Sequence, residues 1–238
     1  MSPFLRPLAG PAILFAHRGA SAHAPENTLE SFGLAARLGA TGLESDVWVT
    51  ADGVAVLDHG GIVGSRIRRR PINQIRRDQL PPHVPSLAEL YEVCGTGLPL
   101  SLDVKDPEAL RPTLRAAREA GAIDGLWLCH PDHRQLAHWR GIDPDVHLVD
   151  STRLRHLREG PERRAADLRK LGIDGINLHH SDWNGGLTTL FHRFGRVAWG
   201  WDAQHERTIV DLLRTGVDAV FSDHCDHLVE AATIVARD

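Results

Sequence analysis

Cysteine and long apolar runs are scarce in this sequence of 238 residues, and each scarcity argues against a class of protein. The three cysteines, Cys94, Cys129 and Cys225, are odd in number and irregularly spaced, which argues against a disulfide framework or a cysteine zinc site. Reducing, cytoplasmic conditions are therefore expected. No run approaches the ~18 consecutive apolar residues of a membrane span, so we expect no stable membrane insertion. The formal net charge of −4 argues against a nucleic-acid binder.

The N-terminal region has two interpretations. Arg6 and the short apolar run at residues 9–16 are similar to a weak signal peptide. We interpret the run as a first strand, because the motif His17-Arg18-Gly19 follows at once and cleavage there would remove a core strand.

Short apolar runs alternate with amphipathic stretches along the whole chain. Eight runs are predicted strands: 12–16, 42–49, 98–104, 126–129, 146–149, 175–178, 197–201 and 219–222. Helical patterns between them include 28–38, 107–120, 161–171, 206–215 and 226–236. Such alternation predicts a parallel sheet, and eight units in under about 250 residues predict a closed (β/α)₈ TIM barrel. No linker rich in Gly or Ser interrupts residues 1–238, so one barrel domain is expected.

Glycines mark several predicted helix ends. Helical patterns are followed by Gly39, Gly121, Gly172 and Gly216, a position typical of C-terminal caps. The alternative to a barrel, an open doubly wound sheet, would need a glycine-rich phosphate loop after the first strand, and His17-Arg18-Gly19 is not such a loop.

Charged residues gather where the first three strands end, and barrel active sites form at such ends. The candidates are His17, Arg18, Glu44, Asp46, Asp103 and Lys105. Residues two apart share a strand face, so Glu44 and Asp46 point the same way. Burying them unpaired would cost several kcal/mol, which a divalent cation would offset. Three carboxylates, with Asp103 as the third, suit a hard ion such as Mg²⁺ or Ca²⁺.

Other interpretations exist for these residues. Glu44 and Asp46 could form an outward, solvated pair, but the apolar Leu43, Val47 and Val49 alternate with them and suit the helix-facing side. His17 on its own would be a satisfied core histidine. The whole set is more informative than any single member.

His59 follows a predicted hairpin at residues 50–57 that turns at Asp52-Gly53 and returns over the second strand. His17 and His59 would then flank a metal-bound group. Phosphodiester cleavage uses this arrangement, because one imidazole removes a proton from the nucleophile and the other protonates the leaving oxygen. Metal and cationic side chains offset the phosphoryl charge.

Several motifs together closely resemble the glycerophosphodiester phosphodiesterase family. They are His17-Arg18-Gly19, Pro25-Glu26-Asn27-Thr28, Glu44-x-Asp46, Asp52-Gly53, His59, Pro85-Ser86-Leu87, Leu102-Asp103-Val104-Lys105, Val197-Ala198-Trp199 and Phe221-Ser222-Asp223. The resemblance spans nearly the whole chain and implies a metal-dependent enzyme that cleaves small glycerophosphodiesters to sn-glycerol 3-phosphate and an alcohol.

The resemblance also implies residue roles. Glu44, Asp46 and Asp103 would bind the metal, and His17 and His59 would be the acid/base pair. Substrate would be bound by Arg18 and Lys105 at the phosphate and by Trp199 as a wall of the alcohol or glycerol pocket. Ordinary core packing is an equal alternative for Trp199, since tryptophan is often largely buried. Glu26 and Asn27 would shape the first loop, and Asn27 could also cap the first helix.

The chain departs from the family pattern at three places. It has His59-Gly60 where His-Asp is usual, Asp103 where Glu is usual, and Gly200-Trp201-Asp202 where Thr-Val-Asn follows the tryptophan. The last change concerns the identity of the alcohol rather than the chemistry.

The stretch at 60–85 is predicted to be irregular and is rich in arginine: Arg66, Arg68, Arg69, Arg70, Arg76 and Arg77. It is either a solvated loop or a basic collar that attracts phosphorylated substrate.

Two other functions are compatible with the same barrel. One is a lysophospholipase D, which would need an apolar mouth, and the arginine-rich stretch argues against such a mouth. The other is a barrel that binds phosphorylated ligands without catalysis. Loss of one of four residues would favour that function, but all four are present: His17, Glu44, Asp46 and His59.

Overall fold

Eight parallel strands close into a barrel in the computed structural model, which describes residues 5–8, 10–65 and 68–238. The barrel strands are β1 (Ile13–Ala16), β2 (Gly42–Val49), β6 (Leu100–Val104), β7 (Leu126–His130), β8 (His147–Ser151), β9 (Gly175–His179), β10 (Val197–Trp201) and β11 (Ala219–Ser222). Each pairs with the next, and β1 pairs with both β2 and β11, which closes the ring. The predicted (β/α)₈ TIM barrel and all eight predicted strands are confirmed.

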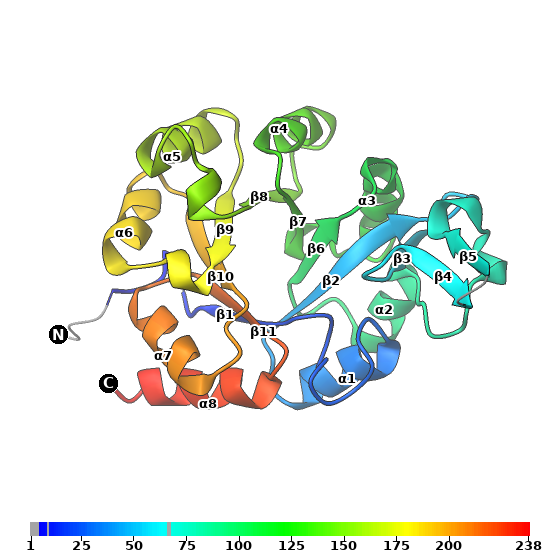
Figure 1. Ribbon diagram of the computed structural model, residues 1–238, viewed down its shortest axis with the longest axis horizontal. Coiled ribbons are helices and arrows are strands. Elements are labelled where there is room, and N and C mark those ends of the chain that lie inside the picture. Colours follow the sequence, from blue (N-terminus) through cyan, green and yellow to red (C-terminus); the bar gives the residue numbers. More distant parts are fainter. Residues whose placement is uncertain (1–4, 9, 66–67) are drawn as a thin grey trace.

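Helices surround the barrel (Figure 1). They are α1 (Leu29–Arg37), α2 (Leu87–Cys94), α3 (Leu110–Glu119), α4 (His133–Ile142), α5 (Pro161–Lys170), α6 (Gly185–Arg193), α7 (Glu206–Arg214) and α8 (Cys225–Val235). Short 3₁₀ turns are η1 (Ile72–Gln74), η2 (Arg77–Gln79), η3 (Pro107–Ala109), η4 (Ile123–Gly125), η5 (Leu154–His156) and η6 (His180–Asp182). The predicted caps Gly39, Gly121, Gly172 and Gly216 have φ of 95°, 69°, 68° and 83°, the left-handed conformation of a C-terminal cap.

Successive side chains along each strand point alternately towards the helices and into the barrel, and this produces two buried layers of side chains. Leu43, Val47 and their equivalents on other strands face the helices and form the main core. The opposite faces fill the barrel interior with a smaller cluster: Phe15, Cys129, Val149, Trp199, Ala219 and Phe221. The rings of Phe15 and Phe221 stack with centroids 4.6 Å apart. We call this cluster the aromatic floor, because it fills the interior of the barrel with packed side chains.

The stretch predicted to be irregular contains a small antiparallel sheet of β4 (Ile62–Ser65) and β5 (Arg68–Pro71). It lies beyond β2 in Figure 1 and has its own apolar cluster of Val56, Ile72, Ile75, Leu80 and Val84. Arg66 lies outside the described residues. The hairpin predicted at Asp52-Gly53 is confirmed, because β3 (Ala55–Leu57) pairs antiparallel with the end of β2.

The helix-one cap differs from the prediction. Thr28, not Asn27, caps α1: its hydroxyl accepts from the Ser31 N–H in a reciprocal capping box. Asn27 has φ 56° and its side-chain oxygen accepts a 2.7 Å hydrogen bond from Ser45 on the outer face of β2. Asn27 therefore fixes the first loop to the barrel wall instead of capping the helix.

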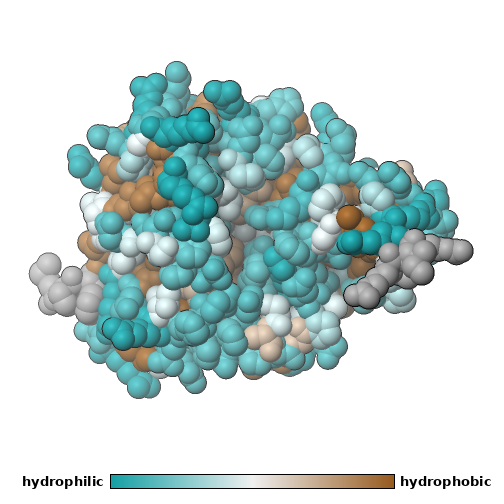
Figure 2. All heavy atoms as spheres, in the orientation of Figure 1, coloured by the Kyte–Doolittle hydropathy of each residue, from teal (hydrophilic) through white to brown (hydrophobic). Residues whose placement is uncertain are grey.

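The polarity of the surface and the lengths of the helices show whether the protein has features of a membrane-spanning protein. The face shown in Figure 2 is largely hydrophilic, with hydrophobic atoms in scattered groups. Across the described parts of the chain, every helix is too short or too polar to traverse a bilayer.

Candidate active site

A cavity of about 430 Å³ opens above the aromatic floor, at the carboxyl ends of the strands. It is lined by His17, Arg18, Glu44, Ser101, Asp103, Ser151, Asn177, Trp201, Asp202, Gln204 and Phe221. Four of the predicted site residues, from β1, β2 and β6, are in this lining. The barrel brings them together because all its strands run parallel and end at one rim.

His17 is fixed between two carboxylates. Its Nδ1 lies 2.6 Å from Asp223 Oδ1, and its Nε2 lies 3.8 Å from Glu44 Oε2. Burial disfavours the imidazolium, but Glu44 and the Asp223 hydrogen bond outweigh burial and raise the pKa of His17 to about 9. Asp223 also accepts a 3.0 Å hydrogen bond from Ser21. Asp223 was not predicted as a site residue, although a polar residue directly after a barrel strand was an available signal.

The backbone after β1 explains the His17-Arg18-Gly19 motif. Arg18 has φ 53°, and its N–H donates to Glu44 Oε2 at 2.9 Å. Gly19 has φ 78°, and a side chain there would collide with Ser31. The turn therefore needs glycine, and it holds Arg18 in a strained conformation of the kind found at functional sites.

The Arg18 side chain connects His59 to the carboxylates. Its Nη1 donates to Glu26 Oε2 at 2.9 Å, its Nε lies 3.3 Å from Asp46 Oδ2, and its Nη2 lies 3.4 Å from His59 Nε2. His59 Nδ1 lies 3.3 Å from the same Asp46 oxygen. The His59 side chain is 49% exposed, so it stands at the solvent side of the cluster while His17 lies deeper.

Asp46 and Asp103 face each other across β2 and β6, with Lys105 between them. They are direct partners in the strand register. Lys105 Nζ lies 2.9 Å from Asp46 Oδ1 and 3.1 Å from Asp103 Oδ2. Burial works against the Asp46 carboxylate, but Lys105 and Arg18 outweigh burial and keep the pKa of Asp46 below its usual range.

Glu44 has the opposite balance of charges. Burial raises its pKa to about 7, against the lowering effect of His17, and the carboxylates of Asp46 and Asp103 add to the rise. A buried carboxylate in this state gains from a nearby cation. The surrounding donors are oxygens, and burial raises the pKa of Cys129 well above its usual range, so its sulfur stays a thiol. This donor set fits a hard divalent ion.

The carboxylates of Glu44, Asp46 and Asp103 do not form the coordination shell of a single cation in this structure. In the described chain, the groups that bring three ligand atoms within 4.8 Å of one another are His23, His224 and Asp226, and His179, His180 and Asp202. Glu44, Asp46 and Asp103 are not such a group, since Lys105 occupies the space between the two aspartates. A cation shared by all three would have to displace Lys105.

Trp199 does not line the cavity. It is 1% exposed and packs in the aromatic floor against Phe15, Trp127 and Phe221. Trp201, two residues further on the same strand face, is the tryptophan of the cavity wall. The structure therefore agrees with the alternative of core packing for Trp199. Depth within the barrel depends on strand stagger, which a local pattern does not contain.

Asn177 is a further lining residue that the sequence did not single out. It is 5% exposed, and its side-chain oxygen is buried without a hydrogen-bond partner. Buried polar atoms are normally paired, so this oxygen suits a ligand hydroxyl or amine. Asn177 is uncharged and lies inside β9, so nothing in the sequence marked it as a site residue.

The basic collar is separate from the cavity. The lining of the cavity does not include Arg69, Arg70, Arg76 or Arg77. Arg77 pairs with Glu89 at 2.7 Å, Arg70 donates to the Gln74 carbonyl at 2.7 Å, and Arg76 lies 3.6 Å from Asp52. These contacts favour the interpretation of a structured surface segment.

Comparison with known proteins agrees with this geometry. The sequence model of the Glycerophosphoryl diester phosphodiesterase family matches residues 17–95. A glycerophosphodiester phosphodiesterase of Caldanaerobacter subterraneus is 49% identical over 244 residues, covering 91% of this chain and 96% of that protein. A probable glycerophosphodiester phosphodiesterase 2 of Mycobacterium tuberculosis is 28% identical, covering 96% and 92%.

Solved structures show the same fold. A phosphodiesterase of Oleispira antarctica, in complex with the product sn-glycerol-3-phosphate, superimposes with a TM-score of 0.82 at 23% identity, covering 94% of this chain and 97% of that one. The identity and coverage of the Caldanaerobacter relative extend the match well beyond the N-terminal motifs. The chain therefore belongs to the glycerophosphoryl diester phosphodiesterase family of hydrolases.

Proposed function

We propose that this protein hydrolyses glycerophosphodiesters to sn-glycerol 3-phosphate and an alcohol, with a divalent cation. The observation that supports the proposal best is the pair of histidines on either side of a buried cluster of carboxylates and cationic side chains. His17 reaches Glu44, and His59 reaches Asp46 and Arg18. The phosphodiesterase that holds sn-glycerol-3-phosphate shares the barrel on which this cluster is built.

Glu44, Asp46 and Asp103 are the proposed ligands of Mg²⁺ or Ca²⁺. When bound, the ion would polarise a phosphoryl oxygen and offset its negative charge. Arg18 and Lys105 border the same space and would bind the other phosphate oxygens, Arg18 with its planar fork and Lys105 as a compact charge. Lys105 would exchange its bonds to Asp46 and Asp103 for phosphate.

His17 is proposed as the general base. Its Nδ1 is engaged by Asp223, so Nε2 is the atom that can take a proton from the nucleophile. With Glu44 charged and no cation, the raised pKa of about 9 keeps His17 protonated at neutral pH. Compensation of the Glu44 charge lowers that pKa towards neutrality and frees the base, so cation binding and His17 are coupled.

His59 is proposed as the general acid. Its exposed position places it next to the solvent, where the alcohol departs, and its contacts with Asp46 and Arg18 orient the ring. For the substrate's hydroxyls, the unpartnered oxygen of Asn177 is the proposed acceptor, and Trp201 with Asp202 forms the wall beside them.

Turnover assays test this function. Purified protein is incubated with glycerophosphocholine, -ethanolamine, -inositol and a lysolipid, with and without EDTA. Release of glycerol 3-phosphate is followed for the glycerophosphodiesters, and release of lysophosphatidate is followed for the lysolipid. We expect activity on glycerophosphodiesters that EDTA abolishes and Mg²⁺ or Ca²⁺ restores. Glu44→Gln should be inactive, whereas Glu92→Gln on the exposed side of α2 is the matched control. Full activity of Glu44→Gln in chelator would exclude the proposed metal role, and turnover of the lysolipid alone would indicate a lysophospholipase D.

A further inference from the structure

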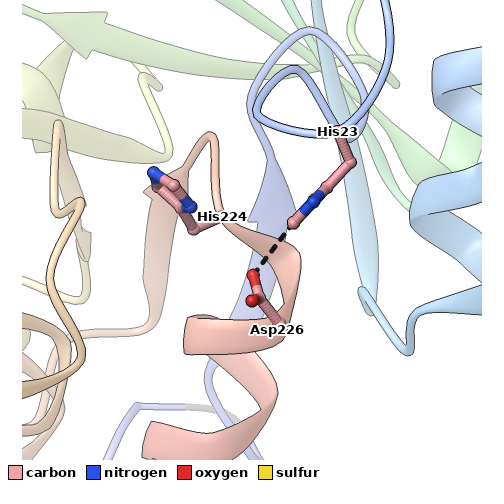
Figure 3. A group of neighbouring side chains, drawn as sticks. All are labelled: His23, His224 and Asp226. Atoms are coloured by element: carbon pink, nitrogen blue, oxygen red, sulfur yellow. Dashed lines mark hydrogen bonds and ion pairs between the residues drawn. The ribbon is translucent and has the colours of Figure 1, made fainter.

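Two segments far apart in the sequence bring a second set of ligand-type side chains together on the barrel rim. His23 comes from the β1–α1 loop, whereas His224 and Asp226 lie at the start of α8. One ligand atom from each lies within 4.8 Å of the others. Figure 3 shows His23 reaching from its loop to Asp226, with a 3.1 Å contact between Nε2 and Oδ1, and His224 beside them. We call these three residues the rim cluster.

The surroundings of the rim cluster restrict its movement. The His224 ring stacks on His227, with centroids 4.6 Å apart and planes 16° apart. His227 is itself held, because its Nδ1 lies 2.9 Å from the Gln204 carbonyl oxygen. The His23 backbone N–H donates to the Ala20 carbonyl at 2.8 Å. These contacts hold the His23 loop and the His224 ring in place, so the ligand atoms of the rim cluster stay close together.

We propose that the rim cluster binds a borderline divalent transition ion, with Zn²⁺ as the representative. Two imidazoles and one carboxylate suit zinc, cobalt or nickel, whereas the oxygen-only set at Glu44 suits a hard ion. His23 and Asp226 are exposed and His224 is half-buried, which leaves room for water to complete the coordination shell. The ion replaces the His23–Asp226 contact rather than any contact of the active site.

The other histidine cluster fits an ion less well. His179 Nδ1 accepts a hydrogen bond from the Ser181 N–H at 3.2 Å, and its Nε2 lies 3.1 Å from Asp202. Asp202 also lines the catalytic cavity. An ion there would compete with substrate, whereas the rim cluster lies outside the cavity lining.

An ion in the rim cluster would tie together the two segments that hold His17. Asp223, the partner of His17, directly precedes His224, and its carbonyl accepts a 3.2 Å hydrogen bond from the Ala22 N–H beside His23. A metal bridge across this junction stabilises the folded state by linkage, because the unfolded chain does not hold the three ligands together. Thermal unfolding is therefore a second readout of binding.

The test uses the full-length protein, stripped of metal with EDTA and dialysed. Zn²⁺ is titrated by calorimetry, and Co²⁺ is titrated by visible absorption. We expect the wild type to bind Zn²⁺ and His23→Gln, His224→Gln and Asp226→Asn to bind it about 10-fold or more weakly. The controls Glu44→Gln and His179→Gln should keep this binding event. Zn²⁺ should raise the unfolding temperature of the wild type and of both controls but not of the rim variants.

Two results would overturn the proposal. One is unchanged Zn²⁺ affinity in folded His23→Gln and Asp226→Asn, and the other is loss of the binding event in His179→Gln alone. His23 and Asp226 are exposed, so these two variants decide the matter even if His224→Gln fails to fold. The readouts are independent of phosphodiester turnover, so failure of this site and failure of the proposed hydrolysis can be told apart.

Discussion

The two histidines of the active site differ in depth, and this difference predicts different behaviour with different leaving groups. General acid catalysis contributes about 10²–10⁴-fold when the leaving oxygen is basic and little when it departs readily as an anion. His59→Ala should therefore be severely impaired on glycerophosphocholine but much less on a nitrophenyl phosphodiester, while His17→Ala should be impaired on both. Steady-state kcat/KM on the two substrates measures this. The reverse pattern would mean that the roles are exchanged, and a loss of only a few-fold in all cases would rule out the histidine pair.

Asp223 is predicted to act through His17. Asp223→Asn replaces the acceptor at Nδ1 with an amide that can donate, which favours the proton on Nε2 and removes the base function. We expect kcat to fall by about 10²-fold or more with KM little changed. Nitrogen NMR of the neutral His17 ring, recorded at a pH above its pKa of about 9, should show the proton moving from Nδ1 to Nε2. Asp211→Asn, exposed on α7, is the matched control, and an unchanged tautomer with normal kcat would refute the role.

At the scale of elements, the arginine-rich stretch at 60–85 is either a basic collar that attracts substrate or a solvated surface segment. Its arginines have local partners such as Glu89 and the Gln74 carbonyl, and the cavity lining includes none of those that the structure describes. We therefore expect the double variant Arg69→Ser/Arg70→Ser to keep kcat/KM within about two-fold of wild type at low and high salt, since steering would contribute 10-fold or more and fall with ionic strength. Arg18→Ser is the contrasting variant and should lose most activity. A salt-dependent loss in the double variant would restore the collar hypothesis.

At the scale of the whole molecule, a hard cation should stabilise the barrel through Glu44. Mg²⁺ or Ca²⁺ at 100 times its dissociation constant adds about 2.7 kcal/mol, or roughly 5–10 °C in Tm for a chain of this size. The shift should be larger at pH 8 than at pH 5.5, because Glu44, with a pKa of about 7, is protonated at the lower pH and a protonated carboxyl is a poor ligand. Differential scanning calorimetry of EDTA-treated protein measures it. Glu44→Gln should show no shift, and an equal shift in that variant would place the ion elsewhere.

The sequence by itself determined the repeating architecture and pointed to most of the charged side chains that the structure gathers at the carboxyl ends of the strands. Period-two apolar runs, helical patterns and capping glycines are local properties, so they predicted eight strands and the closed barrel. Glu44 and Asp46 share a strand face because backbone geometry requires it. One local prediction was wrong: Asn27 and Thr28 are both good caps, and the contact of Asn27 with Ser45, 18 residues away, decided between them.

Only the tertiary structure decided depth, charge pairing and contacts between the chain ends. Trp199 and Trp201 share a face, but barrel stagger puts the first in the floor and the second in the wall. Asp223 meets His17 across 206 residues, and Asp226 meets His23 across 203, because β11 closes the barrel against β1. The alternation of residues along a strand determines which face of the strand a side chain lies on. The closure of the barrel and the register of its strands determine which distant side chain it contacts.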